Sequence, residues 1–262
     1  MLIDTHAHLD FPGLSEDIPG VLDRAAKRGV REVITIGTDL DSSRKAIDIS
    51  RTFQNVYAAV GVHPHEAFLM DEAALDDLKT LARDERVVAI GEIGLDFHYN
   101  HQPPEVQKEC LHRQLRAACE VGLPVVFHVR EAHEEFLSIV SDYVSSLPGV
   151  VLHCFSGDWA VAERALAMGF YLSIPGIVTF PKSAEMQEVA RRAPIDRLLV
   201  ETDSPYLSPI PFRGKPNEPA HVHYTAQKIA DLRRCQFDEI AARTTENAHT
   251  VFGLARFKAE RG

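Results

Sequence analysis

Short runs of apolar, often β-branched residues recur along this chain, and each is followed by a stretch in which apolar positions repeat at helical spacing. The runs predict eight strands, at residues 2–5, 33–38, 56–62, 87–93, 124–129, 150–154, 170–174 and 197–202. Near-continuous apolar strands that alternate with helices are typical of a parallel sheet covered on both faces. Eight such units in 262 residues favour a closed (β/α)8 TIM barrel, an α/β fold, over an open sheet.

The ends of the predicted helices support separate β/α units within one domain. A helix expected at residues 105–121 begins directly after Pro103 and Pro104 and ends at Gly122, the pattern of a helix bounded by proline and glycine. No linker, low-complexity tract or block of charge divides the sequence. We therefore expect a single domain over residues 1–262.

One loop is unusual, because residues 204–220 contain five prolines and one glycine, which exclude regular structure. The loop follows the eighth predicted strand. In a barrel of this kind the functional loops leave the carboxyl ends of the strands. This stiff segment therefore either walls the pocket or clasps the last helices, and the sequence leaves both interpretations open.

The chain is acidic, with 28 Lys and Arg against 38 Asp and Glu and a net charge of −10. That balance argues against a surface that grips duplex nucleic acid by bulk electrostatics, although bound cations could attract phosphate locally. Four scattered cysteines without a CxxC pair, and no signal peptide or long apolar span, fit a cytoplasmic protein without a membrane segment. We expect all four thiols to be buried.

The first predicted strand carries two histidines, in the sequence DTHAHLD. His6 and His8 stand two residues apart, so on a strand both side chains lie on one face and point into the mouth of the barrel. Burying imidazole costs free energy unless each nitrogen finds a partner, and two imidazoles on one face can share a metal ion. Such pairs also occur by chance, so the ends of other strands decide between a metal site and core histidines.

Further strand ends carry the same chemistry. Glu92 stands between two glycines in an apolar run, where an ionised carboxylate is costly to bury without a counter-charge. His128, His153 and Asp203 end the fifth, sixth and eighth strands. Singly, each has an ordinary explanation as a hydrogen-bonded core histidine or a capping aspartate. Together, four histidines and two carboxylates supply ligands for two divalent ions, with one carboxylate as a bridge.

The motifs that hold these residues resemble the TatD family of metal-dependent hydrolases, in the amidohydrolase-like superfamily of barrels. They occur in family order and spacing over essentially the whole chain, as DTHAHLD, GVHPH, IGEIGLD, FHVREA, LHCFSGD and VETDSPYLSPIPFRGKPNEP. The resemblance implies two divalent metal ions per chain, Mg²⁺, Mn²⁺ or Zn²⁺, and the DNase members are associated with Mg²⁺. It also implies the ligands: His6, His8 and Asp203 surround the first metal, His128 and His153 the second, and Glu92 bridges them.

Two carboxylates receive catalytic roles from this arrangement. Glu92 would hold the metal pair together, and Asp203 is the candidate general base that takes a proton from the attacking water and returns it to the leaving alkoxide. Structural ligation alone is the competing role for Asp203. The chain departs from the family pattern only beside these residues: Phe212 stands where histidine is frequent, Glu131 replaces aspartate, and GLDFH often ends in tyrosines.

A further set of polar side chains could bind substrate: His63, His65, Arg130, Ser156, Arg213 and Lys215. The cations could hold phosphate, arginine through its planar fork and lysine as a point charge. The two histidines end the third strand, and they or the serine could contact phosphate or hydrogen-bond a ligand carboxylate. Solvated surface charges and satisfied core groups are the competing interpretations.

The leading hypothesis is a metal-dependent deoxyribonuclease, a 3′ to 5′ exonuclease on single-stranded DNA, because a pocket at a barrel mouth reaches a free end more readily than an internal duplex bond. We expect a monomer with no obligate protein partner. One rival is an ester or amide hydrolase on the same scaffold, such as a D-aminoacyl-tRNA deacylase. Another is a catalytically silent metal-binding protein, which the intact set of six ligands disfavours.

Overall fold

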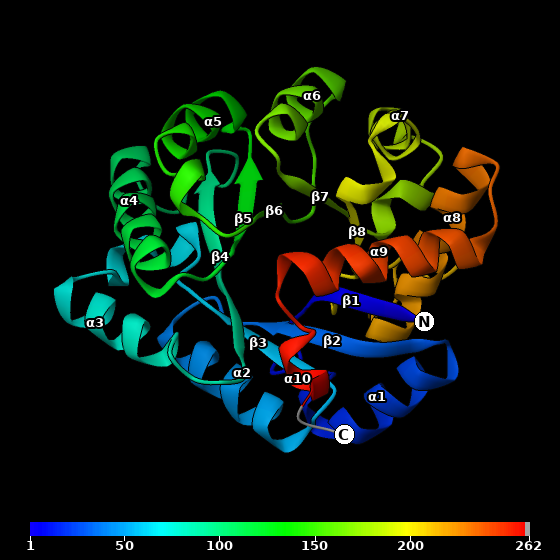
Figure 1. Ribbon diagram of the computed structural model, residues 1–262, viewed down its shortest axis with the longest axis horizontal. Coiled ribbons are helices and arrows are strands. Elements are labelled where there is room, and N and C mark those ends of the chain that lie inside the picture. Colours follow the sequence, from blue (N-terminus) through cyan, green and yellow to red (C-terminus); the bar gives the residue numbers. More distant parts are fainter. Residues whose placement is uncertain (260–262) are drawn as a thin grey trace.

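The computed structural model describes residues 1–259, in which eight parallel strands form one sheet in sequence order, each strand hydrogen-bonded to the next. The strands are β1 (Leu2–Ala7), β2 (Val30–Ile36), β3 (Val56–Val60), β4 (Val87–Asp96), β5 (Val125–Arg130), β6 (Val150–Leu152), β7 (Tyr171–Ile174) and β8 (Leu198–Val200). Figure 1 shows them around a central axis with helices outside. The predicted (β/α)8 barrel is confirmed.

The helices alternate with the strands and cover the outside of the barrel (Figure 1). The α-helices are α1 (Ile18–Lys27), α2 (Leu40–Thr52), α3 (Glu72–Leu81), α4 (Pro104–Val121), α5 (His133–Ser141), α6 (Trp159–Ala167), α7 (Ala184–Arg192), α8 (Val222–Arg233), α9 (Phe237–Val251) and α10 (Arg256–Ala259). Short 3-10 helices are η1 (Ser15–Asp17), η2 (Pro64–Leu69), η3 (Val144–Ser146), η4 (Gly176–Thr179), η5 (Ile195–Arg197) and η6 (Pro219–His221). The last of these begins inside the segment expected to be irregular.

The first and last strands meet and nearly close the barrel. Ala7 and Ser204 form a parallel bridge just beyond the end of β8. Lower in the barrel, the hydroxyl of Thr5 donates a hydrogen bond of 3.0 Å to the carbonyl of Val200. These contacts bring the carboxyl ends of β1 and β8 together, although residue 203 lies almost 200 positions after the first histidine pair in the chain.

Two apolar cores hold the layers in place. The larger core lies between the strands and the surrounding helices, and the smaller one fills the barrel with alternate strand residues such as Ile3, Ile34 and Tyr57. Phe252 and Phe257, from the end of the chain, belong to the inner core. Figure 1 shows α9 and α10 across one end of the barrel, where Asn247 donates to the carbonyl of Leu198 at the start of β8. The end of the chain thus closes the amino-terminal end of the barrel.

Several local predictions need adjustment. β4 extends to Asp96, three residues beyond its predicted end, because hydrogen bonding to β5 continues there. The helix predicted at residues 105–121 is present as α4, and Gly122 ends it with a φ of 70°, in the left-handed region that favours glycine.

The expectation that all four thiols are buried was wrong. Cys110 is buried, whereas Cys119, Cys154 and Cys235 are partly exposed, and all four are free. Within residues 1–259, no helix combines the length and the apolar character that crossing a bilayer requires.

Candidate metal centre

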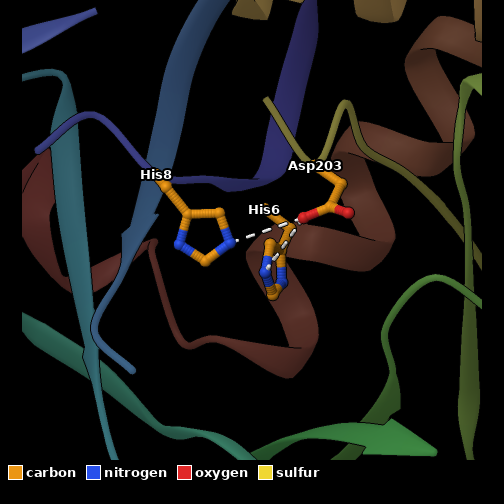
Figure 2. A group of neighbouring side chains, drawn as sticks. All are labelled: His6, His8 and Asp203. Atoms are coloured by element: carbon orange, nitrogen blue, oxygen red, sulfur yellow. Dashed lines mark ion pairs between the residues drawn. The ribbon is translucent and has the colours of Figure 1, made fainter. Parts of the chain in front are cut away.

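One oxygen of Glu92 faces the histidine pair of β1. Oε2 of Glu92 lies 3.3 Å from Nε2 of His6 and 4.0 Å from Nε2 of His8. Oδ1 of Asp203 completes this side, at 3.4 Å from Nε2 of His8 and 3.8 Å from Nε2 of His6 (Figure 2). His6, His8 and Asp203 place one ligand atom each within 4.8 Å of one another, so this group can hold a metal ion.

The other oxygen of Glu92 faces a second group of imidazoles. Oε1 lies 3.0 Å from Nδ1 of His128, 3.3 Å from Nε2 of His153 and 3.6 Å from Nε2 of His63. Glu92, His63 and His128 also satisfy the spacing of a metal site. The carboxylate of Glu92 therefore stands between two sets of ligands, with one oxygen directed to each. That is the arrangement expected of a bridging carboxylate.

The junction of β1 and β8 positions the first group. The backbone N–H of Asp203 donates to the carbonyl of His6 at 2.9 Å, and the N–H of His8 donates to the carbonyl of Ser204 at 2.8 Å. Asp203 adopts a φ of 55°, which residues other than glycine seldom occupy. These reciprocal hydrogen bonds hold it there, and such conformations cluster at functional sites.

A glycine brings β5 against β4 at the centre of the site. Gly94 pairs with His128 in the sheet, and a Cβ atom added to Gly94 would lie 1.9 Å from the carbonyl oxygen of His128. Only glycine permits so close an approach. Gly94, two residues after Glu92, thus allows His128 to reach the carboxylate.

The buried imidazoles fit a metal ion. Both ring nitrogens of His6 are buried and form no hydrogen bond with any described residue. An unpartnered buried nitrogen is costly, unless its lone pair coordinates a cation. Nδ1 of His8 lies 3.3 Å from the carbonyl of Ile36. Since a carbonyl only accepts, Nδ1 of His8 carries a proton, which leaves Nε2, the nitrogen that faces Asp203, as the one that would bind a metal ion.

The electrostatics of the cluster keep both carboxylates charged. Burial would raise the pKa of Glu92, but the surrounding imidazoles, with His153 first among them, lower the pKa well below its usual value. Burial opposes ionisation of Asp203 as well, yet the hydrogen bond from His8 lowers the pKa of Asp203. For His6, burial and then the nearby His153 lower the pKa. Ionised carboxylates and a neutral His6 are the protonation states that metal ligands require, whereas Glu201 and Glu92 raise the pKa of His153 to about 10 against the effect of burial, so a metal ion would displace its proton.

Two carboxylates behind the histidines were missed by the sequence analysis. Oδ2 of Asp96 lies 3.1 Å from Nε2 of His128, and Oε1 of Glu201 lies 2.9 Å from Nδ1 of His153. Each carboxylate faces the ring nitrogen that points away from Glu92. Carboxylates in this position orient metal-binding histidines and fix which nitrogen carries the proton. Both residues end apolar strands, the same signal that identified Glu92.

Asp4 is a third missed carboxylate, and it braces the junction of β1 and β8. Fully buried, it accepts hydrogen bonds from the backbone N–H of Thr202 at 2.8 Å and from the Thr202 hydroxyl at 2.6 Å. Burial raises the pKa of Asp4 to about 8, although both bonds from Thr202 act to lower it. Asp4 thus fixes the residue before Asp203 without facing the ligands.

The cluster lies at the base of a cavity of about 690 Å³, and the structure divides the predicted substrate-binding residues between this cavity and the surface. His63, His65, Arg130 and Ser156 line the cavity. His65 also shares Oδ2 of Asp96, at 2.9 Å from its Nε2. These four side chains are therefore placed to meet a bound molecule.

The proline-rich loop walls this cavity through its first residues, Tyr206 and Leu207. Farther along, Glu218 accepts a hydrogen bond of 2.7 Å from Arg24 of α1, and the ring of Phe212 lies 5.3 Å from that of Tyr224 in α8, so the loop also clasps the first and eighth helices. Arg213 and Lys215 are exposed outside the cavity lining of the described chain, and Arg213 lies over the ring of Phe180 at 4.6 Å from its centroid.

The fold and the site together define a class, the metal-dependent hydrolases built on a (β/α)8 barrel. Within that class the chain belongs to the TatD family, because the family model described as TatD related DNase matches residues 3–253. The resemblance noted in the sequence motifs is therefore confirmed, and the protein is a hydrolase of this family.

Relatives align with the chain over nearly their full lengths. The uncharacterized metal-dependent hydrolase YabD of Bacillus subtilis is 42% identical over 254 residues, which cover 97% of this chain and 100% of the relative. The 3′-5′ ssDNA/RNA exonuclease TatD of Shigella flexneri is 37% identical over 259 residues, with 97% and 100% covered. The crystal structure of YjjV, a TatD homologue from Escherichia coli, superposes with a TM-score of 0.91 at 34% identity, covering 96% of this chain and 98% of that one.

Proposed function

We propose that this hydrolase is a 3′ to 5′ exonuclease that removes nucleotides from single-stranded DNA with the help of two divalent metal ions. The observation that carries the proposal is the position of Glu92, whose two oxygens face two separate sets of imidazole and carboxylate ligands. A relative 37% identical to this chain is named as an exonuclease on single-stranded DNA and RNA, which supports a nucleic-acid end as substrate.

Six side chains would hold the metals, His6, His8 and Asp203 on one side of the bridge Glu92, and His128 and His153 on the other. The position of His63, 3.6 Å from Oε1 of Glu92, adds a seventh candidate on the second side. Bound there, divalent cations would lower the pKa of a water molecule and stabilise negative charge on phosphoryl oxygens. Imidazole-rich sites suit Mn²⁺ or Zn²⁺, whereas Mg²⁺ prefers oxygen ligands.

Asp203 would move the proton during hydrolysis. Its Oδ1 faces the two histidines of β1, and Figure 2 shows the second carboxylate oxygen directed away from both rings. Because the pKa of Asp203 is lowered, the carboxylate is charged and accepts a proton from the attacking water. As water adds to phosphorus and the bond to the 3′ oxygen breaks, Asp203 returns the proton to that oxygen. The products are a 5′-mononucleotide and a strand shortened by one residue.

The cavity would admit the end of a strand. Arg130 lines its wall and can donate two parallel hydrogen bonds to phosphate, and Ser156 can donate one. Two divalent cations would carry four positive charges into the site, against the negative charges of Glu92 and Asp203. Phosphate could therefore approach the site although the chain has a net charge of −10.

The test is digestion of single-stranded DNA labelled at its 5′ end, with Mg²⁺ or Mn²⁺ added. Replacement of Asp203 by Asn should lower the rate by roughly 10²- to 10⁴-fold, the usual contribution of a positioned general base. Replacement of Asp196, an exposed residue at the opposite end of β8, by Asn is the matched control and should leave the rate unchanged. Circular dichroism should be the same for all three proteins.

A substrate panel separates the proposal from its rivals. Single-stranded DNA, duplex DNA, RNA and D-aminoacyl-tRNA should be compared under the same metal conditions. Stepwise shortening of single-stranded DNA from the 3′ end, faster than any other reaction, is the expected result. Deacylation of D-aminoacyl-tRNA without loss of nucleotides would replace the exonuclease by an ester hydrolase, and no turnover of any substrate would favour a silent metal-binding protein.

A further inference from the structure

Two exposed tyrosines line the cavity beside the metal-binding cluster. Tyr99 is 55% exposed and Tyr206 is 50% exposed, and they are the only exposed tyrosines in the described chain. Exposed aromatic surface that gathers in a groove commonly marks the place of a ligand. Neither tyrosine is one of the proposed metal ligands or the proposed general base.

The backbone of each tyrosine is hydrogen-bonded to an aspartate of the site. Tyr99 follows Asp96 by three residues, and its backbone N–H donates to Oδ1 of Asp96 at 2.9 Å. Tyr206 follows Asp203 by three residues, and its N–H donates to the carbonyl of Asp203 at 2.8 Å. The buried side chain of Asn217 donates to the carbonyl of Tyr206 at 2.6 Å and fixes it further. The backbone of each tyrosine is therefore held beside the cluster.

The two rings lie on different sides of the cluster. The centroid of the Tyr206 ring is 6.3 Å from that of His8, on the side where Oε2 of Glu92 faces the β1 histidines. The ring of Tyr99 is 5.7 Å from that of His65, which shares Asp96 with His128 on the other side. A phosphate bound at the centre would thus have one aromatic ring toward each of its two neighbouring nucleosides.

Each tyrosine ring has aromatic or basic neighbours of the kind that contact nucleotides. The ring of Phe11 lies 5.9 Å from that of Tyr206, nearly perpendicular to it, so the two enclose a corner of the cavity. The ring of His101 is stacked at 5.8 Å on Tyr99, and the Arg130 guanidinium lies 4.6 Å from the centroid of Tyr99. Aromatic faces with arginine beside them bind single-stranded nucleic acid without preference for sequence, because every base has a π face.

Building on the exonuclease proposal above, we propose that Tyr99 and Tyr206 form two base-stacking subsites, one for the 3′-terminal base and one for the base before it. The scissile phosphate lies between them, and Arg130 contacts the backbone beside Tyr99. The subsites require two unpaired bases, so they select a single-stranded end over a blunt duplex end. They accept any base, because stacking does not depend on hydrogen-bond pattern.

The experiment pairs ring variants with substrates that lack a base. Tyr99→Leu and Tyr206→Leu remove the rings, whereas Tyr99→Phe and Tyr206→Phe keep them. Phe68→Leu is the matched control, because Phe68 is 60% exposed and lies outside the cavity lining of the described residues. The probes are decathymidylate with a 5′ fluorescein, and the same oligonucleotide with an abasic last or penultimate nucleotide. Cleavage is followed as kcat/KM, and binding by fluorescence anisotropy in an Asp203→Asn background.

Each leucine variant should lose about 5- to 150-fold in affinity and in kcat/KM for the intact oligonucleotide, and each phenylalanine variant should stay within about twofold of the parent. The decisive result concerns the abasic probes. With the tyrosine present, removal of the base should lower affinity and kcat/KM by the same factor as replacement of the tyrosine by leucine. With leucine in its place, loss of the base at the matching position should cost nothing more.

Leucine variants that bind the intact oligonucleotide like the parent would overturn the subsites. Independent effects would do the same, in which the loss of affinity for a leucine variant on the abasic probe equals the product of the two separate losses. This outcome is separate from the exonuclease proposal. Binding that depends on the rings, without release of nucleotides, would contradict the exonuclease and support the subsites. Cleavage at the same rate in the leucine variants would support the exonuclease and contradict the subsites.

Discussion

His128 lies between two carboxylates, with Nδ1 at 3.0 Å from Oε1 of Glu92 and Nε2 at 3.1 Å from Oδ2 of Asp96. One nitrogen of the ring serves the metal-binding cluster, and the other is held by a carboxylate behind it. The hydrogen bond to His128 is the main influence that lowers the pKa of Asp96 against the effect of burial. Asp96 is therefore charged and sets the orientation of the ring.

Replacement of Asp96 by Asn should weaken metal binding by about 10- to 100-fold, the usual effect of removing such a carboxylate. The neutral amide keeps the size of the side chain and can still accept the N–H of Tyr99, so the fold should persist. Isothermal titration with Mn²⁺ measures the affinity, and Asp142→Asn, at an exposed position, is the control. An affinity equal to that of the parent protein would mean that Asp96 does not position His128.

Removal of metal should destabilise the protein. The metal-free cluster leaves the nitrogens of His6 without hydrogen bonds in a buried site, and a ligand that binds only the folded state adds stability by mass action. Mn²⁺ at a hundred times its dissociation constant should raise the free energy of unfolding by about 2.7 kcal/mol. Thermal unfolding with EDTA and then with Mn²⁺ checks this. In Glu92→Gln the shift should shrink, and an unfolding temperature indifferent to metal would contradict the prediction.

Replacement of Asp4 by Ala should destabilise the fold, because it leaves the N–H and the hydroxyl of Thr202 buried without their partner. Each orphaned group costs about 1–3 kcal/mol, so a loss of roughly 2–6 kcal/mol is expected. Urea unfolding measures it. A single variant as stable as the parent would show that Asp4 does not brace the junction of β1 and β8.

The thiol of Cys110 should make stability fall in alkaline solution. Burial raises the pKa of this thiol to about 12, while the hydrogen bond from Gln114 opposes the shift. In the unfolded chain the thiol ionises near its ordinary pKa of 9.0, so above that pH the unfolded state gains stability and the folded state does not. From pH 9 upward the loss approaches about 1.4 kcal/mol per pH unit.

Urea unfolding of the parent and of Cys110→Ala, at pH 8 and pH 10, isolates this contribution. The variant should lose less stability than the parent between the two values of pH. Native protein should also leave Cys110 unmodified by a thiol reagent at pH 8, while the partly exposed Cys119 and Cys235 react. Equal pH dependence in parent and variant would contradict the assignment.

The barrel and the ends of its strands could be predicted because both depend on local pattern. Apolar runs that alternate with helices specify a parallel sheet, and a polar residue such as Glu92 or His153 at the end of such a run must face the mouth of the barrel. The same reasoning applied one step further would have found Asp96 and Glu201. Asp96 ends the same strand as Glu92, and Glu201 stands two residues before Asp203, so each of these strands offers a second carboxylate.

Other features depend on contacts between distant segments and could not be predicted. Five prolines show that residues 204–220 are irregular, but they do not show which side chains turn inward. That Tyr206 lines the cavity while Arg213 lies over Phe180 follows from how the loop packs on η4 and α1. The partnership of Asp4 with Thr202 joins positions 198 residues apart, and it exists only once the barrel closes.

The most direct test of the central claim, that the two oxygens of Glu92 serve two metal ions, is an anomalous difference map from a crystal grown with excess Mn²⁺. Two peaks are predicted, one among Glu92, His6, His8 and Asp203 and the other among Glu92, His128 and His153. A single peak, or none with the imidazoles turned apart, would contradict the account.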